Sequence, residues 1–158
     1  MPRRISERRS DPVLLDTHVW IWLADGEADR LSSACVALLR EAHADARLYV
    51  SPISVWEVAR LVRKRRVGLT QDLRAWVGRA FTEGIRFAQL TPDMALDSGL
   101  LPDVPPRDPA DQMLIATARA LGASLVTRDS EILDYGAQGH VNVVDAAAKR
   151  VTIKVLRE

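Results

Sequence analysis

The sequence predicts an α/β protein with a central parallel sheet, and two observations lead to this fold class. Short apolar segments typical of strands alternate with longer segments in which apolar residues recur at helical spacing. The first strand-like segment, Val13-Leu14-Leu15, has three apolar residues in a row, as expected for a strand covered on both faces. It ends on Asp16, at the edge where open α/β sheets bind their ligands.

Length and composition indicate one compact domain. The chain has 158 residues, 47% of them hydrophobic, and its net charge of +1 excludes a generally polybasic protein. The single cysteine, Cys35, has no partner for an internal disulfide, and no Cys or His spacing is typical of zinc, so we expect a cytoplasmic protein. No apolar run approaches the ~18 residues of a membrane span, so we expect no membrane partner.

We expect the folded domain to cover residues 12–145. Residues 1–11 form a basic extension with four arginines, which we interpret as a flexible tail or a phosphate-contacting arm. It lacks the apolar stretch of a secretion signal. Residues 146–158 form a C-terminal tail whose apolar residues alternate between positions 151 and 155, as in an added edge strand.

The sequence of the first half of the domain predicts two strands, a short helical turn and two helices. Residues 12–17 form the first strand, and an Asp-Gly pair ends the apolar stretch 18–23, where we expect a short helical turn. A serine cap opens a helix at about 31–43, and 48–50 is the second strand. A Ser-Pro pair then opens a helix over 51–66, because serine caps well and proline suits the first helical position.

The second half continues the alternation. Capping residues followed by proline, Thr91-Pro92 and Asp108-Pro109, open two helices, and Gly84 and Gly122 mark helix ends. The expected helices are 71–83, 91–100, 108–121 and 130–133. The expected strands are 85–90, 124–127 and 141–144.

Several acidic residues stand at strand ends or near helix starts. Asp16 and Asp129 follow two apolar strands, and parallel strands end at one edge of a sheet. Glu57 lies near the apolar stripe of its helix, where an unpaired carboxylate is costly. Asp108 and Asp111 open another helix, and Asp111 shares a face with apolar residues. These acids are therefore candidates for one cluster.

Each acid also has a structural interpretation. Asp16, Asp108 and Asp129 are possible N-caps, and Asp111 falls at the third helical position, where an acid suits the helix dipole. Glu57 has Arg60 or Arg128 as a possible ion-pair partner. Two carboxylates ~4 Å apart repel each other by roughly 4 kcal/mol at an effective dielectric near 20, so a cluster needs a cation. Oxygen ligands alone favour Mg²⁺ or Mn²⁺ over zinc.

Four segments carry a resemblance to a known family. They read LLDTHVW at 14–20, SPISVWEV at 51–58, DPADQMLIATA at 108–118 and LVTRD at 125–129. In these segments the chain resembles the PIN-domain nucleases, and more narrowly the VapC-type toxins of bacterial toxin–antitoxin pairs. The resemblance covers about residues 12–145 and implies a parallel sheet with helices on both faces.

The resemblance also implies a function and a site. It implies a Mg²⁺-dependent endoribonuclease, with Mn²⁺ as a possible substitute, that dimerises and is inhibited by a cognate antitoxin. The acidic quartet would be Asp16, Glu57, Asp111 and Asp129. Thr127 would support it, and Asp108 is a secondary candidate.

Basic and aromatic residues are candidates for RNA contacts. The best phosphate contacts are Arg60, Arg63, Lys64, Arg65 and Arg66, although a solvated helix end is their alternative interpretation. Arg128 could instead balance the acids, and we interpret His18 as a structural histidine rather than a ligand. The four tryptophans could stack on bases, but their spacing favours a core or a dimer surface.

Three rival functions stay open at this point. One is a PIN-like protein-binding module without catalysis, and another is a PIN nuclease of RNA maturation. A phosphotransfer domain with Asp16 as nucleophile is disfavoured, because the usual second aspartate two positions later is replaced by His18.

Overall fold

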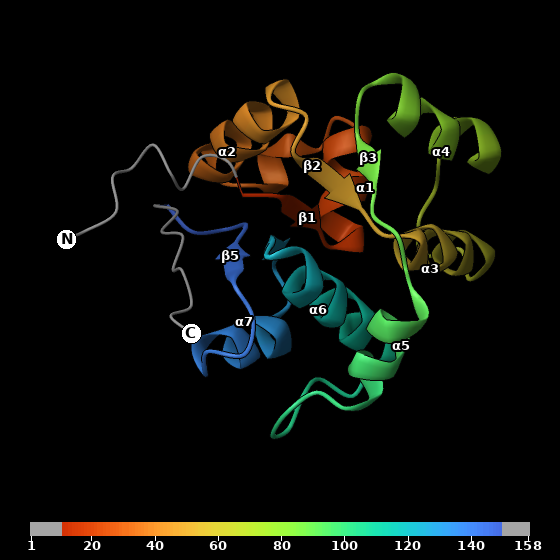
Figure 1. Cartoon of the computed structure of the whole chain (residues 1–158). Helices are drawn as coiled ribbons and strands as arrows, with labels where there is room; N and C mark the ends of the chain where they lie inside the picture. Colours follow the sequence, from red (N-terminus) through yellow and green to blue (C-terminus); the bar gives the residue numbers. More distant parts are fainter. Residues whose placement is uncertain (1–10, 150–158) are drawn as a thin grey trace.

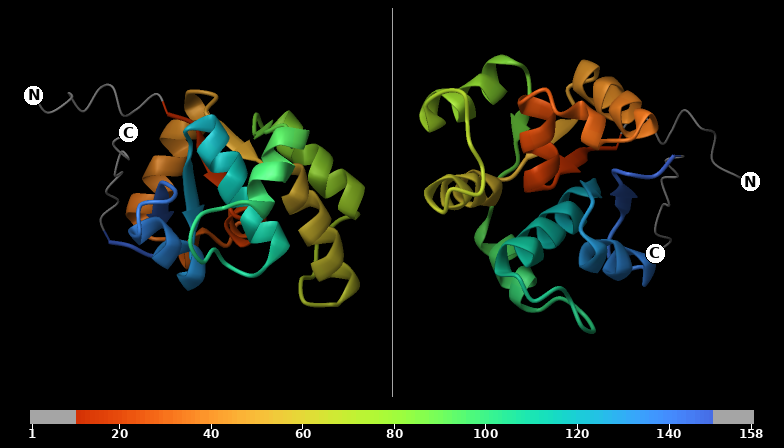
Figure 2. Two further views of the ribbon diagram at one scale, coloured as in Figure 1. Left: turned by 60° about the horizontal axis from the view of Figure 1, so that its bottom comes forward. Right: turned by 180° about the vertical axis from the view of Figure 1, so that it is seen from behind.

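All five strands of the central sheet run parallel, as predicted, in the order β3-β2-β1-β4-β5 (Figure 1). The strands are β1 (Val13–Leu15), β2 (Leu48–Val50), β3 (Arg86–Phe87), β4 (Ser124–Thr127) and β5 (Val143–Asp145). They belong to a computed structural model, which describes residues 11–149. Helices cover both faces of the sheet, so the predicted α/β class is confirmed (Figure 2).

The helices begin and end on residues that favour helix termini. They are α1 (Thr17–Ala24), the 3₁₀ turn η2 (Ala28–Arg30), α2 (Ser33–Ala44), α3 (Pro52–Arg63), α4 (Leu73–Thr82), α5 (Pro92–Gly99), α6 (Pro109–Leu121) and α7 (Ser130–Ala137). The Ser51 hydroxyl caps α3 by accepting from Ile53 N, and Thr91 caps α5 by accepting from Met94 N. Gly122 ends α6 at φ +63°, in the left-handed region that favours glycine.

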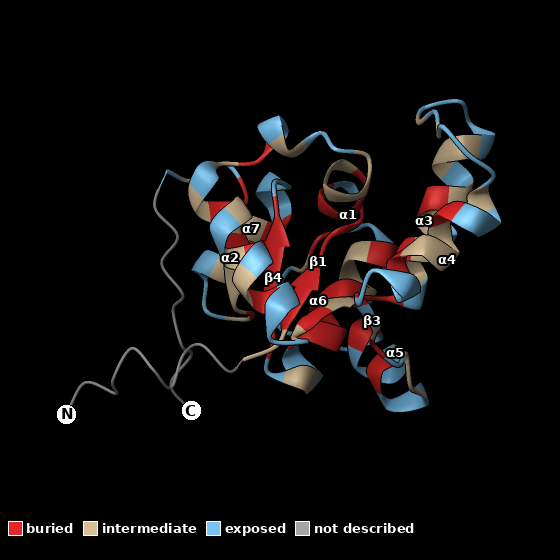
Figure 3. Cartoon of the chain, turned by 90° about the horizontal axis from the view of Figure 1, so that it is seen from above, coloured by how far each residue is buried: buried red, intermediate tan, exposed pale blue. Residues whose placement is uncertain are grey.

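Alternate residues of β1 enter two separate hydrophobic cores. Val13 and Leu15 pack with α1 to α4 on one face, whereas Leu14 packs with α6 and α7 on the other. All three side chains are at most 2% exposed, which is the pattern of a central parallel strand (Figure 3). The apolar run is therefore buried on both faces, as its composition predicts.

The chain changes its direction of winding between β1 and β4. It adds β2 and β3 on one side of β1, returns through α5 and α6, and adds β4 on the other side. At the carboxyl ends of these two strands, Asp16 N donates to the Val126 carbonyl at 2.9 Å. Ligands of open α/β sheets bind at such a point, so the topology singles out the residues that follow β1 and β4.

The predicted boundary between the first strand and the first helix is wrong. The strand ends at Leu15 rather than at residue 17, because Asp16 has the extended conformation of an N-cap and the helix begins at Thr17. The short helical turn expected at 18–23 is an α-helix of eight residues, α1. The carboxylate therefore stands in the junction itself, between a buried strand and a buried helix start.

Other boundaries differ by a few residues. The helix expected at 51–66 ends at Arg63, and the three cations that follow lie in a turn where Arg65 has φ +56°. That turn is exposed, so the polar residues gain little from continuing the helix (Figure 3). In addition, the strand expected at 85–90 covers 86–87, the helix expected at 130–133 extends to 137, and the last strand lies at 143–145 rather than 141–144.

The terminal parts of the predicted domain organisation lie outside the described residues. These parts are the basic extension up to residue 10 and the edge strand predicted between residues 151 and 155. The last described residues, 146–149, form a turn and a bend after β5. Between residues 11 and 149, no helix combines the length and the apolar character that crossing a membrane requires.

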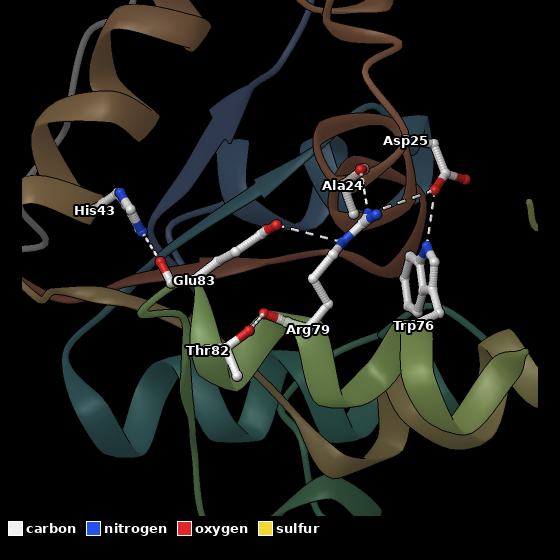
Figure 4. Close-up of polar contacts among 7 residues, drawn as sticks. All are labelled: Ala24, Asp25, His43, Trp76, Arg79, Thr82 and Glu83. Atoms are coloured by element: carbon white, nitrogen blue, oxygen red, sulfur yellow. Dashed lines mark hydrogen bonds and ion pairs between the residues drawn. The ribbon is translucent and has the colours of Figure 1, made fainter. Parts of the chain in front are cut away.

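Helix α4 is attached to the end of α1 by a buried tryptophan and an arginine (Figure 4). Trp76 is 1% exposed, and its Nε1 donates to Asp25 Oδ1 at 2.7 Å. Arg79 donates to the Ala24 carbonyl and lies 3.9 Å from the same carboxylate oxygen. Because Asp25 directly follows α1, these contacts fix the outer helix relative to the helix that starts at the candidate site.

Two helical glycines predict opposite effects of the same substitution. A Cβ added to Gly136 in α7 would lie 2.3 Å and 2.7 Å from the γ-methyl groups of Val143, whereas one added to Gly78 in α4 would meet nothing within 4 Å. We expect Gly136→Ala to lower the free energy of unfolding by about 1–3 kcal/mol through overpacking. We expect Gly78→Ala to raise it by roughly 0.5–1 kcal/mol, because alanine favours a helix. Urea denaturation measures both signs, and a change of the same sign in both variants would contradict the prediction.

Candidate active site

Asp16 is a buried carboxylate with a hydrogen-bond donor on each oxygen. The residue is 8% exposed. Oδ1 accepts from Thr17 N at 2.7 Å, and Oδ2 accepts from the Thr127 hydroxyl at 2.6 Å. Burial raises the pKa of Asp16 above its ordinary value, although both hydrogen bonds act to lower it. Asp16 is therefore both the N-cap of α1 and a candidate ligand, as the two interpretations of the sequence proposed.

Thr127 connects Asp16 to the second predicted strand-end acid. Its Oγ1 accepts from Asp129 N at 2.9 Å while its proton is donated to Asp16. The Asp129 carboxylate caps α7, since Oδ1 accepts from Glu131 N and Ile132 N at 2.8 Å and 3.1 Å. One hydroxyl thus holds the ends of β1 and β4 together.

Glu57 reaches the same place from α3. The Thr17 hydroxyl donates to Glu57 Oε1 at 2.7 Å and is also hydrogen-bonded to Ser54 Oγ at 2.9 Å. Burial raises the pKa of Glu57, and the negative charges of Asp16 and Asp108 raise it further. The carboxylate is therefore oriented by a residue of α1, whose start is capped by Asp16.

The ion pair that the sequence suggested for Glu57 is not formed. Among residues 11–149, neither Arg60 nor Arg128 lies within 4 Å of an acidic oxygen. Arg60 stacks on Trp56 instead, with its guanidinium carbon 4.6 Å from the ring centroid. Arg128 turns toward Trp22, at 5.5 Å from that ring centroid.

Asp111 is the acid for which every cause of the pKa shift acts to raise the pKa. It is half-buried in the first turn of α6, and its pKa is raised to about 8, mainly by burial and further by the charges of Asp16, Asp108, Asp129 and Glu57, in that order. Asp108 is the N-cap of this helix, since its Oδ1 accepts from Ala110 N at 2.8 Å and from Asp111 N at 3.2 Å. All five predicted acids therefore interact electrostatically.

The donor set suits a hard divalent cation. Three of these acids, Asp16, Glu57 and Asp111, have raised pKa values because they are buried near other negative charges. Every available donor is a carboxylate oxygen, the type that Mg²⁺ and Mn²⁺ prefer. In the described part of the chain, no three acidic, histidine or cysteine side chains already stand at metal-binding spacing. Bare carboxylates repel one another, so they are expected to converge only around a cation.

Thr17 and Ser54 are site residues that the sequence alone did not single out. Both are buried, with exposures of 1% and 0%, and both contact Glu57 or its partner. A signal exists in retrospect, because Thr17 directly follows the strand-end Asp16 and Ser54 precedes Glu57 by three residues on one helix face. Small hydroxyl residues are too common in such places for this signal to stand alone.

The predicted RNA contacts lie in the last turn of α3 and in the turn that follows it. These residues are Arg60, Arg63, Lys64, Arg65 and Arg66, and all five are exposed. None of them forms an ion pair with the described acids. Of the five, Arg60 is the one whose charge acts on Glu57. The structure therefore brings the acids together and leaves the cations at the end of α3 free for another partner.

Comparison with known proteins shows which family the chain resembles. A family model described as the PIN domain matches residues 13–138, a range that contains every acid discussed above. Ribonuclease VapC22 of Mycobacterium tuberculosis (strain ATCC 25618 / H37Rv) is 38% identical over 123 residues, which cover 78% of this chain and 91% of that relative. The chain therefore belongs to the PIN-domain family, in its VapC group.

Proposed function

We propose that this PIN-domain nuclease is a Mg²⁺-dependent endoribonuclease that hydrolyses RNA phosphodiester bonds, with Mn²⁺ as a possible substitute. The observation that carries the proposal is the group of acids around the carboxyl ends of β1 and β4, which act on one another electrostatically and form no ion pair with a cation of the described residues. The residues that would hold the ion are Asp16, Glu57, Asp111 and Asp129. Asp108 is a secondary candidate, because it already caps α6.

The chain's own residues would orient the reacting groups. A bound ion of this kind polarises a phosphate oxygen and lowers the pKa of a water. Thr127 fixes Asp16, and Thr17 fixes Glu57, each through one hydrogen bond. A carboxylate that the ion does not fully use would accept a proton from the attacking water, and Glu57 or Asp129 could do so.

Basic residues would counter the repulsion between the acids and RNA. The exposed residues at the end of α3 are Arg60, Arg63, Lys64, Arg65 and Arg66. We propose that they contact backbone phosphates, since such contacts fix the position of a nucleic acid without reading its sequence. Their lack of acidic partners in the described residues supports this role.

We further propose that the protein is the toxin of a toxin–antitoxin pair and acts on cytoplasmic RNA. The relative named ribonuclease VapC22 supports the ribonuclease activity. A cognate antitoxin would inhibit the enzyme by covering the acidic site, where a basic side chain would find uncompensated carboxylates. A homodimer would bury the exposed apolar residues of α5 and the loop after it, Leu96, Leu100 and Val104.

Cleavage of an RNA panel by the purified protein tests the activity. We expect cleavage with Mg²⁺ or Mn²⁺ and none with EDTA. Asp16→Asn should reduce the rate by at least about 100-fold, because the amide keeps the size of the side chain but removes its charge. Exposed Asp97 of α5 provides the control, and Asp97→Asn should cleave like the wild type. Equal cleavage by Asp16→Asn and wild type would refute this active site.

Thr17 provides a test of a positioning residue. Thr17→Val keeps the shape of the side chain but removes the hydroxyl that donates to Glu57. We expect RNA cleavage to fall by about 10–100-fold, as for other residues that orient metal ligands, and the metal concentration needed for half-maximal rate to rise. Thr82→Val, at an exposed position of α4, should change neither quantity. An unchanged metal requirement in Thr17→Val would contradict the positioning role.

The raised pKa values predict how stability depends on pH. Asp111, with a pKa of about 8, stays protonated in the folded protein where the unfolded chain is already ionised. The folded state therefore binds more protons between about pH 4 and pH 8, so metal-free protein should lose stability as pH rises through this window. Thermal unfolding in EDTA from about pH 5 to about pH 9 measures this loss.

The same unfolding experiment, repeated with added metal, shows whether Asp111 is a metal ligand or an acid with a structural role only. Added Mg²⁺ or Mn²⁺ should raise the unfolding temperature, and the increase should be larger at about pH 8 than at about pH 6, because ligands bind after losing their protons. Asp111→Asn should reduce both the pH dependence and the effect of the metal, whereas Asp97→Asn should leave them unchanged. A metal effect that is the same at both pH values would count against Asp111 as a ligand.

A further inference from the structure

The indole ring of Trp22 is surrounded by three basic side chains from separate segments. The guanidinium carbons of Arg128 and Arg30 lie 5.5 Å and 5.7 Å from its centroid. The ring of His18, one turn earlier in α1, is tilted by 47° to the indole, and the two ring centroids are 5.8 Å apart. Since α1 packs against both β4 and η2, these residues form one continuous surface. We call Trp22, Arg30 and Arg128 the Trp22 platform.

The positive charge of the Trp22 platform is only partly compensated. Arg30 forms an exposed ion pair with Glu27 at 2.9 Å, and such pairs are weak. Arg128 forms no ion pair with an acid of the described residues, and its Nη1 donates to the Arg30 carbonyl at 3.2 Å. Both arginines are exposed. Two guanidinium groups near one ring concentrate positive charge, so a bound anion would be stabilised there.

The Trp22 platform adjoins the acidic site. Arg128 directly precedes Asp129, and His18 follows Asp16 by two residues and interacts with its charge. Arg128 is not among the charges that act on Asp16, Glu57 or Asp111. Its guanidinium lies over the Trp22 ring and donates to the Arg30 carbonyl, so positive charge stands beside the acidic site without a direct ion pair to it.

We propose that the Trp22 platform is a binding subsite for the RNA strand, in which Arg128 and Arg30 hold backbone phosphates next to the acidic site. The proposal rests on the proposed ribonuclease function and adds residues that the basic end of α3 does not include. A guanidinium group matches a phosphate because it offers several donors in one plane, and stacking on an indole keeps that plane in position. The subsite would position the strand on the side of the acids formed by α1 and β4.

An acidic protein segment is the other ligand that two arginines would accept. Two features favour the phosphates of RNA. The Trp22 platform lies beside the acids that would act on a phosphodiester, so a strand bound there has further phosphates in reach. Its arginines are exposed and come from a 3₁₀ turn and from the end of a buried strand, which gives an open surface for a continuous polyanion.

Binding of RNA in EDTA tests the subsite without any cleavage. The probe is a fluorescein-labelled single-stranded RNA of mixed sequence, and anisotropy is measured at several salt concentrations. Each phosphate contact on a single strand adds about 0.7 to the slope of log K against log salt. We therefore expect Arg128→Gln to weaken binding about eightfold at about 50 mM salt and about threefold at about 200 mM, and to lower the slope by about 0.7. Arg30→Gln should act in the same direction.

Three further variants exclude simpler explanations. Arg128→Lys keeps the charge, so it should restore the slope although it loses the planar donor group. Arg40→Gln removes an exposed arginine of α2 and should leave both affinity and slope unchanged. Trp22→Leu should weaken binding with little change in slope, because it removes the support but no charge. Thermal unfolding of each variant confirms that it is folded.

The possible results distinguish this subsite from the proposed function. If Arg128→Gln and Arg30→Gln bind the RNA like Arg40→Gln, or if wild type binds no RNA at about 50 mM salt, the subsite is refuted. Unchanged RNA binding together with lost binding of poly-glutamate would assign the Trp22 platform to an acidic protein segment and also refute it. If the arginine variants lose RNA binding while the wild type cleaves no RNA with Mg²⁺, the subsite is supported and the nuclease is refuted.

Discussion

The hydrogen bond from Thr127 to Asp16 is the interaction on which the acidic site depends. It joins the carboxyl ends of β1 and β4 at 2.6 Å, and the same hydroxyl accepts from Asp129 N at 2.9 Å. One side chain therefore fixes a buried carboxylate and the backbone that presents a second acid. A carboxylate buried without such donors would destabilise the fold, so the pairing of the two central strands and the geometry of the site support each other.

Repulsion among the acids opposes the stabilising effect of these hydrogen bonds. Burial raises the pKa values of Asp16, Glu57 and Asp111, and the neighbouring negative charges raise them further. The two hydrophobic cores hold these groups together against that repulsion, through a central strand whose side chains are almost completely buried. Functional sites often contain groups that destabilise the fold, and favourable packing elsewhere in the protein offsets this destabilisation.

Local patterns made the fold class and the grouping of the acids predictable, whereas long-range contacts decided the rest. The apolar run 13–15 and the cap-plus-proline pairs are local signals, and the strand and helices that they predict are present. The contact between Thr17 and Glu57 joins residues 40 positions apart, so no local pattern reveals it. The tryptophans show the same limit: Trp20 is 0% exposed and Trp56 is 49% exposed, because packing of a helix face decides burial.

The net charge of +1 conceals a separation of charge at the edge of the sheet. Arg128 is adjacent in sequence to Asp129, and Arg60 lies one turn from Glu57, yet each guanidinium stacks on an indole instead of pairing with the acid. A direct ion pair would stabilise the ionised carboxylate and compete with a metal for its oxygens. Stacking on aromatic rings keeps the arginines next to the acids without a direct ion pair, although the charge of Arg60 still acts on Glu57. A protein that binds a divalent cation and a polyanion at one edge needs this arrangement, because each ligand requires the opposite sign of charge to stay available.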